Sequence, residues 1–252
     1  RPDETCSTWV HRYRTADHDK SPYFHPAAEF HRCYLRFFFI LALTIWLLTV
    51  PFDRRLVWLH MFTSFWACLY LWIMPAWSVT TAGRDKIRRD VTYIVVSNHQ
   101  SQLDILVAFH LFFPFKWVSK AEIFKLPFIG WNMVLNRYIK LKRGDKAGIA
   151  RMFVDCEKAL AQGNSIFMFP EGTRSKTGAL QEFKTGAARI AIDAQAPILP
   201  VASYFRPDGG HHIVIRPPIP VERHPELIQP AADELLGEAL AHTLRGGELP
   251  GD

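Results

Sequence analysis

The sequence is poor in cysteine and lacks two common catalytic motifs. Its four cysteines, Cys6, Cys33, Cys68 and Cys156, form no CxxC pair and show no spacing typical of metal ligands. We therefore expect reduced thiols in a cytosol-facing protein, rather than a disulfide framework. A GxxxxGK(S/T) loop is absent, which argues against a P-loop nucleotide hydrolase. A GxSxG elbow is also absent, which argues against a serine esterase of the α/β-hydrolase type.

Acidic residues are in the minority. The chain has 24 Asp and Glu against 30 Lys and Arg, which gives a formal net charge of +6. A basic balance suits an anionic partner, such as nucleic acid, anionic lipid or a phosphorylated substrate. Residues 1–33 form a polar leader, and its polar run is too long for a signal peptide.

Two long stretches carry almost no charge. Residues 37–50 are apolar except for two threonines, and residues 56–79 contain no Asp, Glu, Lys or Arg. A short charged turn at 51–55 joins them, so residues 34–80 predict a membrane-embedded helical hairpin. The second stretch carries four tryptophans, which favour the membrane–water interface: Trp58, Trp66, Trp72 and Trp77.

The depth of this hairpin stays open at the level of sequence. Residues 37–50 would span about 21 Å as a helix, less than the roughly 30 Å hydrocarbon core. The hairpin therefore either crosses the bilayer or dips into one leaflet, and both arrangements leave its flanking segments on one side. The alternative is a pair of buried core helices in a soluble protein.

Residues 81–90 form a basic linker, and we place the start of a second domain, 91–252, after it. There, strand and helix patterns alternate, which predicts an α/β domain with a mostly parallel mixed sheet flanked by helices. The predicted strands are 92–97, 116–118, 137–141, 165–169, 198–204 and 212–216. The predicted helices are 102–112, 127–134, 146–162, 184–195 and 231–245.

A polar elbow, SNHQSQLD at residues 97–104, joins a predicted strand to a predicted helix. Elbows of this kind are where α/β proteins place reactive groups. His99 is a candidate general base, because histidine titrates closer to neutral pH than other side chains. Asp104 can fix the His99 tautomer and stabilise its imidazolium. The same residues also fit a structural alternative, in which Ser101 and Asp104 form a capping box and His99 is a turn residue.

A second polar turn, PEGTRS at residues 170–175, follows the predicted strand at 165–169. Glycine allows close backbone approach, hydroxyl groups donate hydrogen bonds, and arginine offers a fork for phosphate. Lys184 lies just beyond, at a predicted helix start that itself favours anions. The alternative is a polar turn with a salt-bridged Arg174.

Four blocks, in order along residues 93–202, together resemble the glycerolipid acyltransferases. Asn98-His99 with Asp104 matches the NHxxxxD motif, and FPEGTRS at 169–175 matches the third block. Residues 120–130 resemble the second block, and LPVA at 199–202 resembles the fourth. The chain most resembles the 1-acyl-sn-glycerol-3-phosphate (lysophosphatidic acid) acyltransferases, whose bacterial members also carry an apolar hairpin. It departs from them at Lys142-Arg143, where members often have Asp-Arg.

The resemblance implies a membrane-bound acyltransferase of phospholipid biosynthesis. It would move a fatty acyl group from a thioester to the sn-2 hydroxyl of lysophosphatidic acid, giving phosphatidic acid. His99 would take the hydroxyl proton, supported by Asp104. The acceptor phosphate would be held by Lys120, Arg143, Glu171, Gly172, Thr173, Arg174 and Lys184. The acyl chain would lie in a groove lined by Ile123, Phe124, Phe128, Trp131 and Met133.

The resemblance also implies the partners. The co-substrate would be acyl-CoA or acyl carrier protein, and no cofactor, metal or nucleic acid would be needed. The hairpin would anchor residues 91–252, the acyltransferase catalytic domain, to the cytoplasmic face of the cell membrane. Two other functions stay open: acyl transfer to another lysophospholipid or a lyso-ornithine lipid, and a membrane module that binds phospholipid without catalysis.

Overall fold

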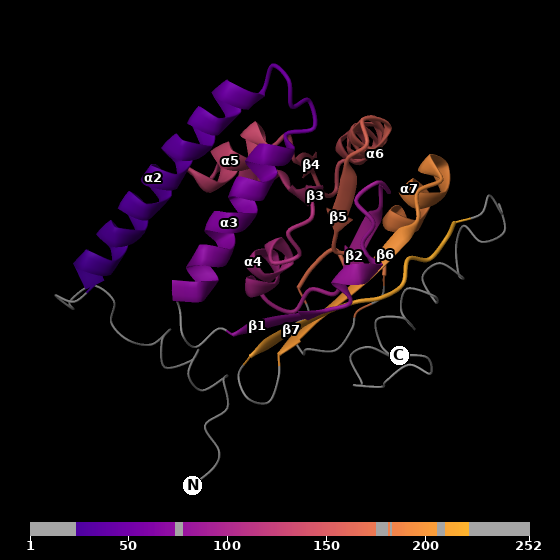
Figure 1. The fold of residues 1–252 in the computed structure, drawn as a ribbon. Coiled ribbons are helices and arrows are strands. Elements are labelled where there is room, and N and C mark those ends of the chain that lie inside the picture. Colours follow the sequence, from indigo (N-terminus) through magenta and orange to yellow (C-terminus); the bar gives the residue numbers. More distant parts are fainter. Residues whose placement is uncertain (1–23, 74–77, 175–180, 182, 206–209, 222–252) are drawn as a thin grey trace, which may run out of the picture.

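A computed structural model describes residues 24–73, 78–174, 181, 183–205 and 210–221. Its centre is a seven-stranded sheet in the order β1-β7-β6-β2-β5-β3-β4 (Figure 1). Neighbouring strands run parallel, except for the antiparallel pair β6–β7. The strands are β1 (Val79–Ala82), β2 (Ile94–Ser97), β3 (Phe115–Lys120), β4 (Ile139–Leu141), β5 (Ser165–Met168), β6 (Ile198–Phe205) and β7 (His211–Ile215).

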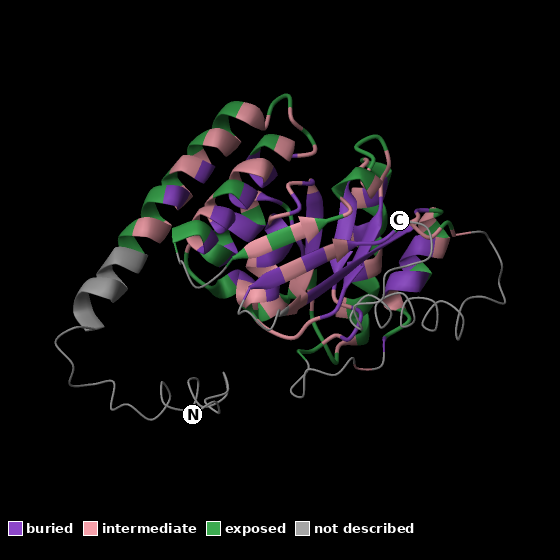
Figure 2. Ribbon diagram, turned by 60° about the horizontal axis from the view of Figure 1, so that its bottom comes forward, coloured by how far each residue is buried: buried purple, intermediate pink, exposed green. Residues whose placement is uncertain are grey.

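Helices cover both faces of the sheet, which explains why the central strands are apolar without alternation (Figures 1 and 2). In β2, Val95 packs in one core cluster with α3 (Val57–Ile73) and α4 (Leu103–Phe109). Ile94 and Val96 pack in the other cluster, with α6 (Lys146–Ala161) and α7 (Gly186–Ala194). The remaining helices are α2 (Phe24–Thr49), α5 (Ile129–Leu135) and two short 3-10 helices, η1 (Arg84–Lys86) and η2 (Ala121–Lys125).

The predicted fold class, a mostly parallel mixed sheet flanked by helices, is confirmed. Sequence patterns missed β1, a four-residue edge strand that pairs only with β7 and is too short to show a period. The predicted helix at 102–112 is shorter in the structure, since α4 ends at Phe109. The predicted helix at 231–245 and most of the polar leader lie outside the described residues.

The predicted hairpin region contains α2 and α3, which pack against each other. Within the described residues, one helical stretch is long and apolar enough to cross a membrane: Arg32–Thr49, with a mean hydropathy of 1.6 and 11% of it buried. Several large apolar side chains of this region are exposed: Phe37, Ile40, Leu47, Leu48, Phe52, Trp58, Phe65 and Trp72. Insertion into a bilayer stays a prediction.

The inner side of α3 belongs to the core of the α/β domain. Ala67, Cys68 and Leu71 are buried in the same cluster as residues of β2, β3 and α4. Residues 81–90 include the end of β1 and all of η1. A domain boundary at residues 81–90 stays a prediction. The shared core shows that α3 packs on the α/β domain that follows this segment.

Lys116 on β3 connects the turn between α2 and α3 to the sheet through hydrogen bonds. Its side chain is buried, and Nζ donates hydrogen bonds to the carbonyl oxygens of Arg55, at 2.8 Å, and Asn136, at 2.9 Å. Burial, together with the charge of nearby Arg137, lowers the pKa of Lys116 to about 7. The Lys116 amino group therefore holds the turn in place, although its burial costs solvation free energy.

We expect Lys116→Met to lower the free energy of unfolding by about 2–4 kcal/mol, because the buried Asn136 carbonyl and the partly buried Arg55 carbonyl lose their donor. The pH dependence should also change. Between pH 7 and 10 the unfolded chain holds a proton on Lys116 that the folded chain has released, so wild-type stability rises with pH. The slope due to Lys116 is at most about 1.4 kcal/mol per pH unit, and the variant should lose it.

Urea unfolding in detergent micelles, followed by tryptophan fluorescence at several pH values, measures both effects. Lys158→Met, at an exposed position on α6, is the matched control. Equal pH slopes for the wild type and Lys116→Met would contradict the assignment.

Candidate active site

The turn after β2 is clasped to the neighbouring strand β6. The Asn98 side chain donates to the Ser203 carbonyl at 2.7 Å and accepts from the Ser203 N–H at 2.9 Å. Asn98 and Ser203 are both buried, so these two hydrogen bonds satisfy groups that water cannot reach. The clasp fixes the chain immediately before His99.

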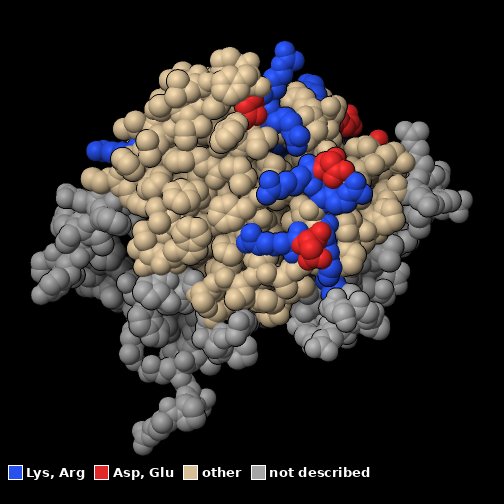
Figure 3. Space-filling model, viewed as in Figure 1, with Lys and Arg blue, Asp and Glu red and all other residues tan. Residues whose placement is uncertain are grey.

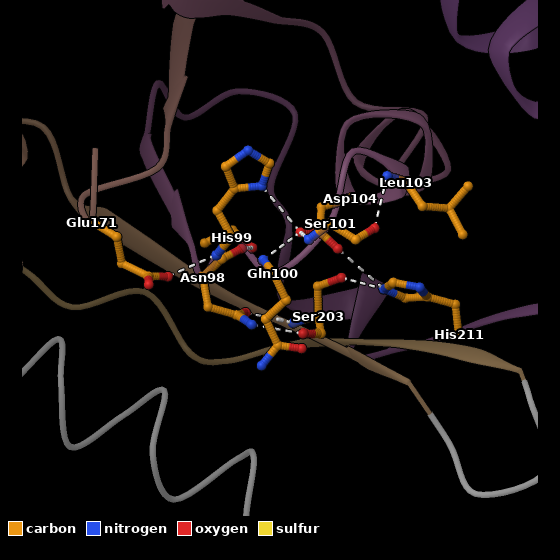
Figure 4. A network of polar contacts seen from close by, with 10 residues as sticks. Asn98, His99, Gln100, Ser101, Leu103, Asp104, Glu171, Ser203 and His211 are labelled. Atoms are coloured by element: carbon orange, nitrogen blue, oxygen red, sulfur yellow. Dashed lines mark hydrogen bonds and ion pairs between the residues drawn. The ribbon is translucent and has the colours of Figure 1, made fainter. Parts of the chain in front are cut away.

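Asp104 gathers the rest of the turn around one carboxylate oxygen (Figure 4). Its Oδ2 accepts the backbone N–H groups of Gln100 and Ser101, each at 2.7 Å, and lies 3.1 Å from His99 Nδ1. The Ser101 hydroxyl also accepts the Leu103 N–H at 2.8 Å. The capping interpretation and the catalytic interpretation are therefore compatible, because the same carboxylate organises the turn and orients the imidazole.

Glu171, from the second polar turn, holds the opposite side of His99. Its Oε1 accepts the His99 backbone N–H at 2.7 Å, and Oε2 accepts the Gln181 N–H at 3.2 Å. Burial raises the pKa of this carboxyl, while its two N–H donors oppose the rise. Glu171 was predicted to face the acceptor phosphate, but the structure uses its carboxylate to join two loops.

Phe169 fixes the plane of the His99 ring. The two rings stack with centroids 4.0 Å apart and an angle of 13° between their planes. Phe169 in turn stacks on Trp117 of β3, at 5.4 Å. The His99 side chain is only 14% exposed, and Asp104 behind it is 2% exposed. With Nδ1 directed at Asp104, His99 is left with Nε2 for an incoming group.

His99 lines a cavity of about 920 Å³ at the carboxyl ends of β3 and β5. Its walls come from both faces of the sheet. Part of the wall, on the α3–α4 face, is formed by Ala67, Leu106, Phe109 and Trp117. Another part, on the α6–α7 face, is formed by Met152, Phe153, Met168 and Ala187. Such positions, outside the carboxyl ends of the strands, are where open α/β sheets bind ligands.

Four cations also line this cavity, and among its described lining residues there is no carboxylate. They are Lys120, Arg143, Lys184 and Arg189, all of them exposed. Figure 3 shows Lys and Arg side chains gathered over the middle and right of one face, while the area over α2 and α3 is almost free of charge. A cavity with apolar walls and cationic groups fits an amphiphile with an anionic end.

The predicted phosphate residues divide into two groups. Lys120, Arg143, Gly172 and Lys184 line the cavity, whereas Glu171, Thr173 and Arg174 do not. Gly172 has a φ of +71°, and a Cβ there would lie 3.0 Å from Lys184 Nζ, so glycine lets this lysine cross the turn. Arg174 is exposed and stands at the end of the described part of its loop.

The predicted groove residues are also divided. Ile123 and Met133 line the cavity, and Phe124, Phe128 and Trp131 do not. Phe128 and Trp131 pack instead against Phe39 of α2, at ring distances of 6.1 and 5.4 Å. These two residues pack α5 against α2. Sequence spacing alone does not distinguish such packing residues from residues that line a ligand groove.

Sequence reasoning missed several residues of the site. Arg189 carried no motif, although it lies in the first turn of α7, whose start follows Lys184 closely. Tyr34, Trp66 and Tyr70 line the cavity from α2 and α3, a region interpreted only as membrane-embedded. Ser203 and His211 lie beside the elbow because β6 pairs with β2 and β7 pairs with β6, and nothing in their local sequence indicated it.

We expect Glu171→Ala to release the His99 turn, because a buried N–H loses its acceptor. Backbone hydrogen exchange over residues 97–102 should become faster, and the free energy of unfolding should fall by about 1–3 kcal/mol. Glu171→Gln, which keeps an oxygen for the His99 N–H, should protect this segment better.

Hydrogen–deuterium exchange measured by mass spectrometry tests this tie between the loops. Glu157→Ala, at an exposed site on α6, is the control and should leave exchange at 97–102 unchanged. If Glu171→Ala also leaves it unchanged, the tie does not hold the turn.

A family model described as Acyltransferase matches residues 78–204, about half of the chain. A 1-acyl-sn-glycerol-3-phosphate acyltransferase of Chlamydomonas reinhardtii is 33% identical, over 79% of this chain and 64% of its own length. A chloroplastic one of Arabidopsis thaliana is 33% identical, over 77% and 54%. One of Pseudomonas aeruginosa is 31% identical, over 43% of each chain. The chain thus spans less than two thirds of the length of these curated relatives.

The fold has a counterpart among solved structures. The crystal structure of a 1-acyl-sn-glycerophosphate acyltransferase from Thermotoga maritima superposes with a TM-score of 0.61. The alignment covers 88% of this chain and 99% of that one, at 21% identity. At this identity the likeness establishes the shared fold.

Proposed function

The chain belongs to the acyltransferase family, and on that premise we propose that it transfers a fatty acyl group from a thioester to the sn-2 hydroxyl of lysophosphatidic acid, giving phosphatidic acid. The observation that carries the proposal is His99, backed by Asp104, in the wall of an apolar cavity with four cations and no carboxylate among its described lining residues. The names of the relatives favour this acceptor.

His99 acts as the general base in this proposal. Its Nε2 takes the proton of the acceptor hydroxyl as the hydroxyl oxygen attacks the thioester carbonyl. Asp104 keeps the proton of the resting ring on Nδ1 and stabilises the imidazolium. The thiolate then leaves and takes up the proton from His99. Because the acceptor hydroxyl is itself the nucleophile, the reaction needs both substrates bound together and no acyl-enzyme.

The cations of the cavity hold the anionic ends of the two substrates. Lys184 and Lys120 lie in the cavity wall with His99, and we assign the acceptor phosphate to them. Arg174 and Thr173 close the same turn from outside the wall and complete this assignment. Arg143 and Arg189 suit the phosphates of acyl-CoA or the acidic surface of acyl carrier protein. No metal or cofactor enters this mechanism.

The apolar walls suit the acyl chains. Ile123 and Met133 belong to the wall near α3, α4 and α5, and we assign the donor acyl chain to this part of the cavity. Tyr34 of α2 and Trp66 and Tyr70 of α3 line the cavity, so entry past these helices would bring both amphiphiles from a bilayer without crossing water. We propose accordingly that the exposed apolar side of α2 and α3 lies in a membrane, with the catalytic domain on its cytoplasmic side.

We expect His99→Ala to lower turnover by at least about 10³-fold, the scale of losing an aligned general base. The assay is release of free CoA on mixing lysophosphatidic acid with acyl-CoA in vesicles, repeated with acylated acyl carrier protein as donor and release of its free thiol as the readout. His60→Ala is unsuitable as a control, because His60 is a buried core residue with two hydrogen bonds. His212→Ala, outside the cavity wall, is the matched control; equal activity of the wild type and His99→Ala would reject the mechanism.

Lys184→Ala and Arg174→Ala should each impair use of the phosphorylated acceptor selectively. We expect kcat/KM to fall about 10- to 100-fold more for lysophosphatidic acid than for an uncharged monoacylglycerol, because a charge-assisted contact is lost. Lys158→Ala on α6 should change neither value. A fall of the same size for both acceptors would remove that residue from the phosphate site.

Two alternatives are separated by the same assay. The cationic cavity also suits other lysophospholipids or a lyso-ornithine lipid, so a panel of lysolipid acceptors decides the substrate. A membrane module that binds phospholipid without catalysis would show saturable lipid binding but no turnover with any thioester. The His99–Asp104 pair favours catalysis, since phosphate binding requires neither residue.

A further inference from the structure

His211 is a buried histidine that the proposed mechanism does not use. It lies on β7, is 1% exposed, and approaches Asp104 from the side opposite to His99 (Figure 4). Its Nε2 is 3.7 Å from Asp104 Oδ1 and 2.5 Å from the Ser203 hydroxyl. The order β7-β6-β2 in the sheet brings these three elements together.

The two oxygens of Asp104 have different surroundings. Oδ2 has three nitrogens within hydrogen-bonding distance, whereas Oδ1 accepts no hydrogen bond from any residue that the structure describes. A buried carboxylate oxygen without a donor is costly. The His211 imidazole faces Oδ1 at a distance that a small ring movement would close, and catalytic hydrogen bonds commonly tighten when substrate is bound.

The surroundings of His211, burial above all, favour its neutral form. Burial lowers the pKa of the His211 ring, His212 on the same strand lowers it further, and the Asp104 charge opposes both. The titratable groups on the other side of Asp104 are His99 and Glu171. A neutral imidazole retains one N–H and can donate it without adding a charge to the site.

We propose that His211 is a positioning residue that acts on His99 through Asp104. Its Nε2–H turns from the Ser203 hydroxyl toward Asp104 Oδ1 while His99 is still the neutral base, before the acceptor proton is taken up, and no proton leaves His211. The inference rests on the proposed function, because that reaction is what protonates His99. Ser203 contributes to this arrangement twice: its backbone hydrogen-bonds the Asn98 side chain, and its hydroxyl hydrogen-bonds the His211 ring.

The proposal predicts the direction of a pH effect. A donor on Oδ1 stabilises the Asp104 anion and weakens its pull on the His99 imidazolium. Without that donor, Asp104 holds the imidazolium more strongly, so His99 becomes a free base only at higher pH. The acid limb of the kcat/KM profile should therefore move to higher pH, and kcat should fall because the carboxylate is held less firmly.

Two amide substitutions separate positioning from packing. In His211→Gln the amide nitrogen can occupy the place of Nε2, and in His211→Asn it lies nearer the place of Nδ1. Gln should retain kcat within about threefold, whereas Asn should lose about tenfold, with KM for the acceptor unchanged in both. The acid limb should move up by roughly half a pH unit or more in the Asn variant alone.

Full-length protein in vesicles, assayed for CoA release from pH 5 to 9, is the test. Ser203→Ala, which removes the hydroxyl but keeps the backbone clasp, should move the limb the opposite way, to lower pH, because the His211 Nε2–H loses the acceptor that competes with Asp104 Oδ1. His212→Asn is the control, because its side chain leaves the opposite face of β7 and contacts Tyr204 and Thr80. Ser203→Ala also decides the matter if His211→Asn does not fold.

The outcomes distinguish the two proposals. A wild type without turnover rejects the proposed function. An active wild type with equal kcat and an equal acid limb in the Gln and Asn variants overturns the role of His211. An unshifted limb in both Ser203→Ala and His211→Asn overturns it as well.

Discussion

The buried Asp104 carboxylate is the constraint on which the site depends. It takes two backbone N–H groups and one imidazole on a single oxygen, and so gathers three consecutive residues, His99 to Ser101, around itself. This arrangement is stable because strands on both sides of β2 hold the turn. Ser203 of β6 clasps it on one side, and Glu171, which follows β5, clasps it on the other. The register of three parallel strands thereby fixes the position of one imidazole.

The fold class and the chemical centre could be predicted from sequence, because both depend on local patterns. The apolar strands, the alternation of strand and helix, and the His99–Asp104 spacing are all visible within a few residues. Glu171 illustrates where such reasoning ends: in a turn with glycine, threonine and arginine, its carboxylate resembles part of a ligand site. Only the tertiary structure shows that it accepts two backbone N–H groups.

Contacts between distant segments account for the other misses. Asn98 and Ser203 are 105 residues apart, and no local sequence pattern at either residue predicts their contact. Phe128 and Trp131 lie in the predicted groove block, yet they face α2. Conversely, α3 supplies part of the cavity wall, although its tryptophans and lack of charge indicated only lipid. One side of a helix can face lipid while the other lines a cavity. The average hydrophobicity of the helix does not distinguish its two sides.

The pairing of β1 with β7 has a practical consequence for anyone who wishes to obtain the catalytic part as a water-soluble fragment. Val79 pairs with His211, and β1 runs on to Ala82 as the outermost strand of the sheet. A truncation placed in the basic segment after residue 82 would remove the apolar helices but would also strip this strand away. It would leave β7 with a row of unpaired backbone groups, a surface that recruits other chains into aggregates. Solubilisation by mutating outward-facing apolar residues of α2 and α3 preserves that edge, and is the better route.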